Sequence, residues 1–162
     1  MIKRGAYILI FVLGVVLGSF ISSSGIIKAS DENPFSNTSP EIRSPYDWIK
    51  EGQIHVLDNR IVIEVENPVW AKFTDTNSMD PIIDYNANAL QIVPKTVEDI
   101  HVGDIISYES QYAEGIIIHR VIGIQNDSDG KYFIVKGDNN PSPDPGKVRF
   151  SQIKKVLIGI IY

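Results

Sequence analysis

Beyond residue 45, the apolar residues of this chain occur in short runs that are rich in valine and isoleucine and are separated by turn residues. Such runs are typical of β-strands, because β-branched side chains favour an extended backbone and the runs are too short for most helices. We therefore predict a mainly β domain over residues 46–162. The predicted strands cover residues 53–57, 60–66, 69–73, 89–93, 104–109, 115–125, 131–136 and 153–162.

The first 28 residues differ in composition from the rest of the chain. Lys3 and Arg4 precede an apolar run at residues 5–27, and Lys28 follows it. A helix of this length spans about 34 Å, which is enough to cross a bilayer core of about 30 Å. We therefore predict a cytoplasmic tip and a single transmembrane helix within residues 1–28, with the remainder outside the cytoplasm. The alternative is a signal peptide that is cleaved near the small residues 22–25.

Residues 29–45 are rich in Ser, Pro, Asn and Asp and contain few apolar residues. This composition predicts a solvated tether. The expected organisation is thus an anchor at 1–28, a tether at 29–45 and an extracytoplasmic β domain at 46–162.

Charge and composition make several functions improbable. Fifteen basic and twenty acidic residues give a net charge of -5, which disfavours a nucleic-acid partner. The chain has no cysteine, so it forms neither a disulfide nor a thiolate zinc site. A site with three histidine ligands would need every histidine of the chain. We therefore expect no metal site.

Ser78 is the candidate nucleophile. It follows the predicted strand at 69–73 and a polar stretch at 74–77, so its hydroxyl group is expected at a strand end. A serine hydroxyl becomes an effective nucleophile when a neighbouring base removes its proton. The alternative is that Ser78 only caps a short helical turn that contains Pro81.

His119 is the candidate base, because it interrupts the apolar run at residues 115–122, which is typical of a buried strand. The alternative is a structural histidine in the core. A predicted loop at 127–130 joins this strand to the next one in a hairpin. One register of this hairpin places Asp138 opposite His119, at about 5 Å, and a shorter loop places Asn140 there instead.

Four motifs occur in order along the chain: Ser78-Met79-Asp80-Pro81, Gly103-Asp104-Ile105-Ile106, Ile118-His119-Arg120-Val121-Ile122 and Lys136-Gly137-Asp138-Asn139-Asn140, with Asp144 after the last. Together they resemble the motifs of type I signal peptidases. The resemblance covers about residues 74–162 and the N-terminal anchor, and leaves residues 29–66 outside it. The bacterial branch has a lysine as the base. Because His119 stands at that position, the chain resembles the archaeal and endoplasmic-reticulum branch.

The resemblance implies a membrane-bound serine endopeptidase that removes signal peptides from exported preproteins. It implies that Ser78 is the nucleophile, His119 the general base, Asp144 an essential acid and Asp138 a second acid. The backbone N–H of Ser78 and the hydroxyl of Thr76 would then stabilise the oxyanion. The hairpin register favours Asp138 as the partner of His119, whereas the resemblance favours Asp144, and both alternatives stay open at this point.

The expected partners are signal peptides of preproteins, the lipid bilayer and the secretion machinery, and the chemistry needs no cofactor. Two other functions fit the same sequence. One is a membrane-tethered β domain that binds an envelope partner without catalysis. The other is a related serine protease that is dedicated to one envelope precursor.

Overall fold

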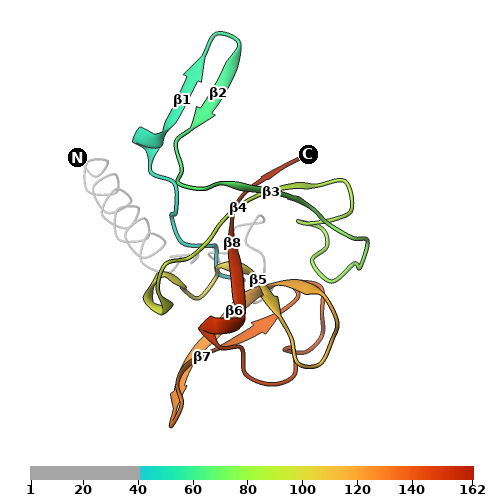
Figure 1. The fold of residues 1–162 in the computed structure, drawn as a ribbon. Coiled ribbons are helices and arrows are strands. Elements are labelled where there is room, and N and C mark those ends of the chain that lie inside the picture. Colours follow the sequence, from blue (N-terminus) through green and yellow to red (C-terminus); the bar gives the residue numbers. More distant parts are fainter. Residues whose placement is uncertain (1–40) are drawn as a thin grey trace, which may run out of the picture. The chain divides into compact units, whose positions relative to one another are not determined.

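Antiparallel β-strands are the main secondary structure of residues 41–162, which are the residues that the computed structural model describes (Figure 1). The prediction of a mainly β fold is confirmed. The expected anchor and most of the expected tether lie outside the described residues. Among residues 41–162, no helix has the length and apolar character that are needed to cross a membrane.

The described strands form a six-stranded sheet in the order β3-β4-β8-β5-β6-β7 and a separate two-stranded sheet of β1 and β2. Short 3-10 helices precede β1 and β8, and a third lies between β4 and β5. The bounds are η1 Glu51–Gln53, β1 Ile54–Leu57, β2 Arg60–Ile63, β3 Val69–Lys72, β4 Asn88–Ile92, η2 Val97–Asp99, β5 Ile105–Glu109, β6 Ile116–Asp127, β7 Gly130–Lys136, η3 Phe150–Gln152 and β8 Ile153–Ile161.

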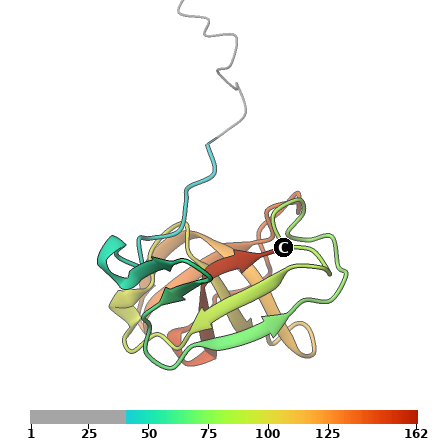
Figure 2. The ribbon, with the colours of Figure 1, turned by 90° about the horizontal axis from the view of Figure 1, so that it is seen from above.

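The six-stranded sheet is buried on both faces at β5. Successive side chains of a strand point to opposite faces, so Ile105 and Ile106 pack into different hydrophobic clusters. Ile106 belongs to the cluster that contains Phe133 of β7, and Ile105 belongs to the one that contains Met79. Figure 2 shows β3 and β4 in front of the orange strands, as expected for a strongly curved sheet. Met79, the residue after Ser78, packs with Ile105 and so lies on this sheet.

The β1–β2 hairpin forms around Asp58 and Asn59, between two of the predicted strands, with Val56 opposite Ile61. It projects from the six-stranded sheet (Figure 1), and all of its strand residues are exposed. Alternation along the strands places Ile54, Val56, Ile61 and Ile63 on one face.

The hairpin of β6 and β7 has the predicted register only near its turn, where Asn126 pairs with Lys131. A bulge between Val121 and Gly123 adds one residue to β6, and beyond it Arg120 pairs with Lys136. A shift of one residue changes which side chains share a face. The expected pairing of His119 with Asp138 or Asn140 in this ladder is therefore wrong.

Asp104 fixes the segment at 43–48 against the domain, and its side chain has no exposed surface. Its Oδ1 accepts hydrogen bonds from the N–H of Tyr46 at 2.8 Å and from Nε1–H of Trp48 at 3.0 Å, and its Oδ2 accepts one from the N–H of His101 at 2.8 Å. Gly103 has a φ of 106°, and a side chain there would clash with the carbonyl of Ser44. Gly103 and Asp104 thus form the turn before β5.

We predict that Asp104→Ala lowers the free energy of unfolding by about 3 kcal/mol, because it leaves three partly buried N–H donors without an acceptor. Urea denaturation followed by tryptophan fluorescence measures this change. Asp75→Ala is the control, because Asp75 is exposed and its removal should change stability by less than about 0.5 kcal/mol. An equal effect of the two substitutions would contradict the role of Asp104.

Candidate active site

A cleft of about 870 Å³ brings Ser78 and His119 together from distant parts of the chain. Ser78 lies in the loop between β3 and β4, and His119 lies on β6. Both line the cleft, together with Thr76, whereas Asp138 and Asp144 lie outside its lining. The two residues that the sequence predicts as nucleophile and base therefore share one cavity.

His119 is paired with Asp144. Its Nδ1 donates a hydrogen bond to Oδ2 of Asp144 at 2.5 Å, and each side chain is only 9% exposed. The carboxylate is an acceptor, so it holds the imidazole proton on Nδ1 and leaves the lone pair on Nε2. Within residues 41–162, Nε2 of His119 makes no hydrogen bond. This nitrogen is therefore available to accept a proton.

Tyr108 gives Asp144 a second hydrogen bond, from its hydroxyl to the same Oδ2 at 2.5 Å. Burial, followed by the hydrogen bond to Asp144 and the charge of its carboxylate, raises the pKa of Tyr108 well above its ordinary value. Tyr108 thus remains a donor across the physiological pH range. The N–H of Asp144 in turn donates to the carbonyl of Val135 at 2.9 Å, which ties the acid to β7. Hydrogen bonds to both the side chain and the backbone of Asp144 thus fix its position.

Asp138 binds Arg120 and not His119. The guanidinium donates from Nε to Oδ1 at 2.7 Å and from Nη2 to Oδ2 at 2.6 Å, which is a bidentate pair. Nη1 of Arg120 also donates to the carbonyls of Gly103 at 2.8 Å and Arg43 at 3.1 Å. The structure therefore resolves the two alternatives from the sequence: Asp144 contacts the histidine, and Asp138 joins the site to the scaffold.

The loop after β7 holds the loop of Ser78 by backbone and side-chain contacts. The N–H of Asn139 donates to the carbonyl of Ser78 at 3.0 Å, and its Nδ2 donates to the carbonyl of Asn77 at 2.9 Å. The N–H of Asp138 contacts Sδ of Met79 at 3.4 Å. Asn77 has a φ of 56°, a conformation that asparagine adopts more readily than most residues. The backbone that carries Ser78 is therefore fixed on both sides.

Both expected oxyanion donors lie beside the candidate nucleophile. Oγ1 of Thr76 is 3.2 Å from Oγ of Ser78. The N–H of Ser78 makes no hydrogen bond in the part of the chain that the structure describes. In the same part, no hydrogen bond joins Ser78 directly to His119.

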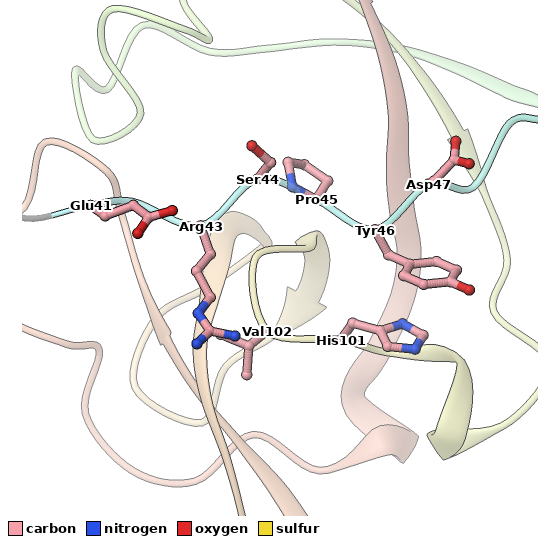
Figure 3. Close-up of a pocket in the computed structure, with 8 residues that line it drawn as sticks. All are labelled: Glu41, Arg43, Ser44, Pro45, Tyr46, Asp47, His101 and Val102. Carbon is pink, nitrogen blue, oxygen red and sulfur yellow. The ribbon is translucent and has the colours of Figure 1, made fainter.

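The other two histidines lie elsewhere. His55 contacts Glu64 at 3.2 Å on the β1–β2 hairpin. His101 stacks on Tyr46 with ring centroids 4.0 Å apart. Both line a shallow hollow of about 480 Å³ with Glu41, Arg43, Ser44, Pro45, Asp47 and Val102 (Figure 3). Over residues 41–162, no three potential metal ligands come together.

Two contributors to this arrangement were not assigned from the sequence, namely Tyr108 and Arg120. Arg120 follows His119 in an apolar strand, so a buried cation there signals a buried carboxylate partner. Tyr108 lies on β5, opposite Ile117 of β6. Its contact with Asp144 depends on a long loop, so local pattern alone gives no signal for it.

The fold and the site define a mainly β protein with a serine and a buried histidine–aspartate pair at one cleft. No family model matches the chain, and no solved structure matches it. A segment of 68 residues is 35% identical to the signal peptidase complex catalytic subunit SEC11 of Scheffersomyces stipitis, and covers 40% of this chain and 41% of that protein. The similarity to a signal peptidase is therefore partial.

A second similarity is to an uncharacterized protein of Methanocaldococcus jannaschii. It is 50% identical over 42 residues, which are 26% of this chain and 21% of that protein. The chain thus spans less than half the length of these curated relatives.

We predict that Gly137→Ala disturbs the loop of Ser78, because a Cβ on Gly137 would lie 2.5 Å from the carbonyl oxygen of Ser78. The expected loss of stability is about 2 kcal/mol, as for other overpacked sites. The amide resonances of residues 77–79 in an NMR spectrum should also shift.

Gly123→Ala is the matched control, because a Cβ there would meet only the flexible side chain of Ile134 at 3.5 Å. Both variants are measured by urea denaturation and by NMR. Unchanged resonances at 77–79 in Gly137→Ala would show that the two loops are not coupled as described.

Proposed function

We propose that this protein is a membrane-bound serine endopeptidase of the signal peptidase type, in the branch that uses a serine and a histidine. Ser78 is the nucleophile, and His119 is the general base. One observation carries the proposal: Ser78 and His119 line the same cleft, and Nδ1 of His119 is hydrogen-bonded to the buried Asp144. The partial similarity to the catalytic subunit SEC11 supports signal peptides as the substrate class.

In the first step, Oγ of Ser78 attacks the carbonyl carbon of the scissile peptide bond while Nε2 of His119 takes the hydroxyl proton. This requires the hydroxyl to rotate from Thr76 towards His119. The negative charge of Asp144 stabilises the imidazolium that forms. The N–H of Ser78 and the hydroxyl of Thr76 donate hydrogen bonds to the oxyanion.

The tetrahedral intermediate then collapses. The C–N bond breaks, the imidazolium gives its proton to the leaving amine, and an ester joins the substrate acyl group to Ser78. A water molecule, deprotonated by His119, hydrolyses this ester and restores the serine hydroxyl. Every proton transfer uses a side chain of the chain itself, so the mechanism needs no cofactor.

The substrate lies extended in the cleft. β3 is an edge strand of the six-stranded sheet, and it contributes Ala71 and Lys72 to the lining of the cleft. The free backbone groups of an edge strand hydrogen-bond to an added peptide strand, and pockets beside it select side chains. Small side chains in the residues before the scissile bond fit into such pockets.

The membrane placement follows from sequence and belongs to the same proposal. Residues 1–28 anchor the protein, residues 29–45 act as the tether, and the β domain from residue 46 acts outside the cytoplasm. The partners are then the bilayer, the signal peptides of exported preproteins and the secretion machinery.

We predict that Ser78→Ala abolishes cleavage of a labelled preprotein by the full-length protein in membranes. The fold should be retained, because loss of a small hydroxyl group at the surface of a cleft costs little stability. Gel analysis of the products gives the activity, and circular dichroism checks the fold. Ser128→Ala is the control, because Ser128 is exposed at the β6–β7 turn.

Cleavage by Ser78→Ala at a rate close to that of the wild type would contradict Ser78 as nucleophile. Failure of the wild type to cleave any preprotein would favour a non-catalytic binding domain. Cleavage of a single envelope precursor among many preproteins would favour a dedicated protease.

A further inference from the structure

The floor of the cleft contains a buried pair of polar side chains, Gln91 and Ser107. Gln91 is 2% exposed and Ser107 is 4% exposed, and Nε2 of Gln91 donates a hydrogen bond to Oγ of Ser107 at 2.7 Å. They come from β4 and β5, which flank β8, so the two side chains meet over β8. Both line the same cleft as Ser78 and His119.

The surroundings of this pair are apolar. The cleft is also lined by Ala71, Phe73, Met79, Ile83 and Ile118, which pack in one hydrophobic cluster. Leu157, which lies opposite Gln91 on β8, belongs to that cluster. A buried polar group costs free energy unless it is hydrogen-bonded, so two apolar side chains would serve a purely structural floor better. The pair is therefore better explained as a contact site for a ligand in the cleft.

The bond between the two side chains leaves hydrogen-bonding capacity on each of them, including the acceptor Oε1 of Gln91 and the hydroxyl hydrogen of Ser107. Oε1 of Gln91 accepts no hydrogen bond within residues 41–162. Gln91 itself lines the cleft. The hydroxyl of Ser107 accepts from Gln91, and its own hydrogen has no acceptor in that part of the chain.

We propose that Gln91 and Ser107 form a subsite for a hydroxyl-bearing side chain of the substrate, a serine or threonine close to the scissile bond. A hydroxyl group donates to Oε1 of Gln91 and accepts from the hydroxyl of Ser107, so it satisfies both unused groups. A valine of the same shape satisfies neither. This proposal rests on the proposed function and specifies the substrate class further.

The position of the selected residue follows from the geometry of an extended peptide. The residue before the cut lies at Ser78, and side chains two residues apart in an extended chain point to the same face. The residue three positions before the cut is therefore also directed to the floor of the cleft. Both of these positions are candidates for the contact with Gln91 and Ser107.

The test uses the full-length protein in membranes and a set of preproteins that differ only at these two positions. Each position carries threonine, valine, serine or aspartate in turn, with alanine at the other, and kcat/KM is measured for each. At one of the positions, threonine should be preferred over valine by roughly threefold to tenfold, the value of one or two net hydrogen bonds. Gln91→Leu and Ser107→Ala should reduce this ratio to about one.

The matched controls are Gln125→Leu and Ser128→Ala, because both residues are exposed at the far end of the β6–β7 hairpin and lie outside the cleft lining. They should keep the ratio of the wild type. The ratio for the wild type tests the subsite even if a variant at the buried pair does not fold.

Three results would overturn the subsite: equal cleavage of threonine and valine substrates at both positions, an unchanged ratio in folded Gln91→Leu and Ser107→Ala, or a preference for aspartate. The last would instead assign selectivity to Lys155, which lies opposite Ser107 and also lines the cleft. If the wild type cleaves the substrates without the predicted preference for threonine over valine, the subsite is rejected but the proposed function is retained. Absence of all cleavage rejects the proposed function and the subsite with it.

Discussion

The guanidinium group of Arg120 is the contact on which the arrangement of the cleft depends. It binds Asp138 in a bidentate pair and also donates to the carbonyls of Gly103 and Arg43. A buried ion pair is costly to desolvate, so its main effect is to fix geometry. Here the ion pair and its two further hydrogen bonds fix three parts of the chain: the segment before the domain at Arg43, the turn before β5 at Gly103 and the loop after β7 at Asp138. That last loop carries Asn139, whose hydrogen bonds hold the backbone at Ser78.

The adjacent residue, His119, has a different task because neighbouring side chains on a strand point to opposite faces. His119 binds Asp144, which also accepts a hydrogen bond from Tyr108, and Arg120 binds Asp138. One pair of residues on β6 therefore supplies both the candidate base and its scaffold. The bulge that follows them on β6, between Val121 and Gly123, sets the offset between β6 and the loop after β7.

The strands were predictable from the sequence because their signal is local: short β-branched runs and turn residues. The partner of His119 was not predictable from the hairpin register, because it depends on a single extra residue in β6 and on a loop that folds back to Val135. The resemblance to signal peptidases favoured Asp144 as that partner, and the structure shows its contact with His119. Gln91 and Ser107 were not identified, because their contact depends on the strand order β4-β8-β5. The catalytic roles themselves stay predictions.

The most direct test of the account is the rate of single-turnover preprotein cleavage, measured from about pH 5 to pH 9 in the wild type and in His119→Ala. A protonated imidazole cannot act as a base, so the wild-type rate should fall on the acid side of the profile. His119→Ala should be slower by roughly a hundredfold to ten thousandfold and should lose this acid limb. A folded His119→Ala protein that keeps both the rate and the acid limb of the wild type would contradict the account.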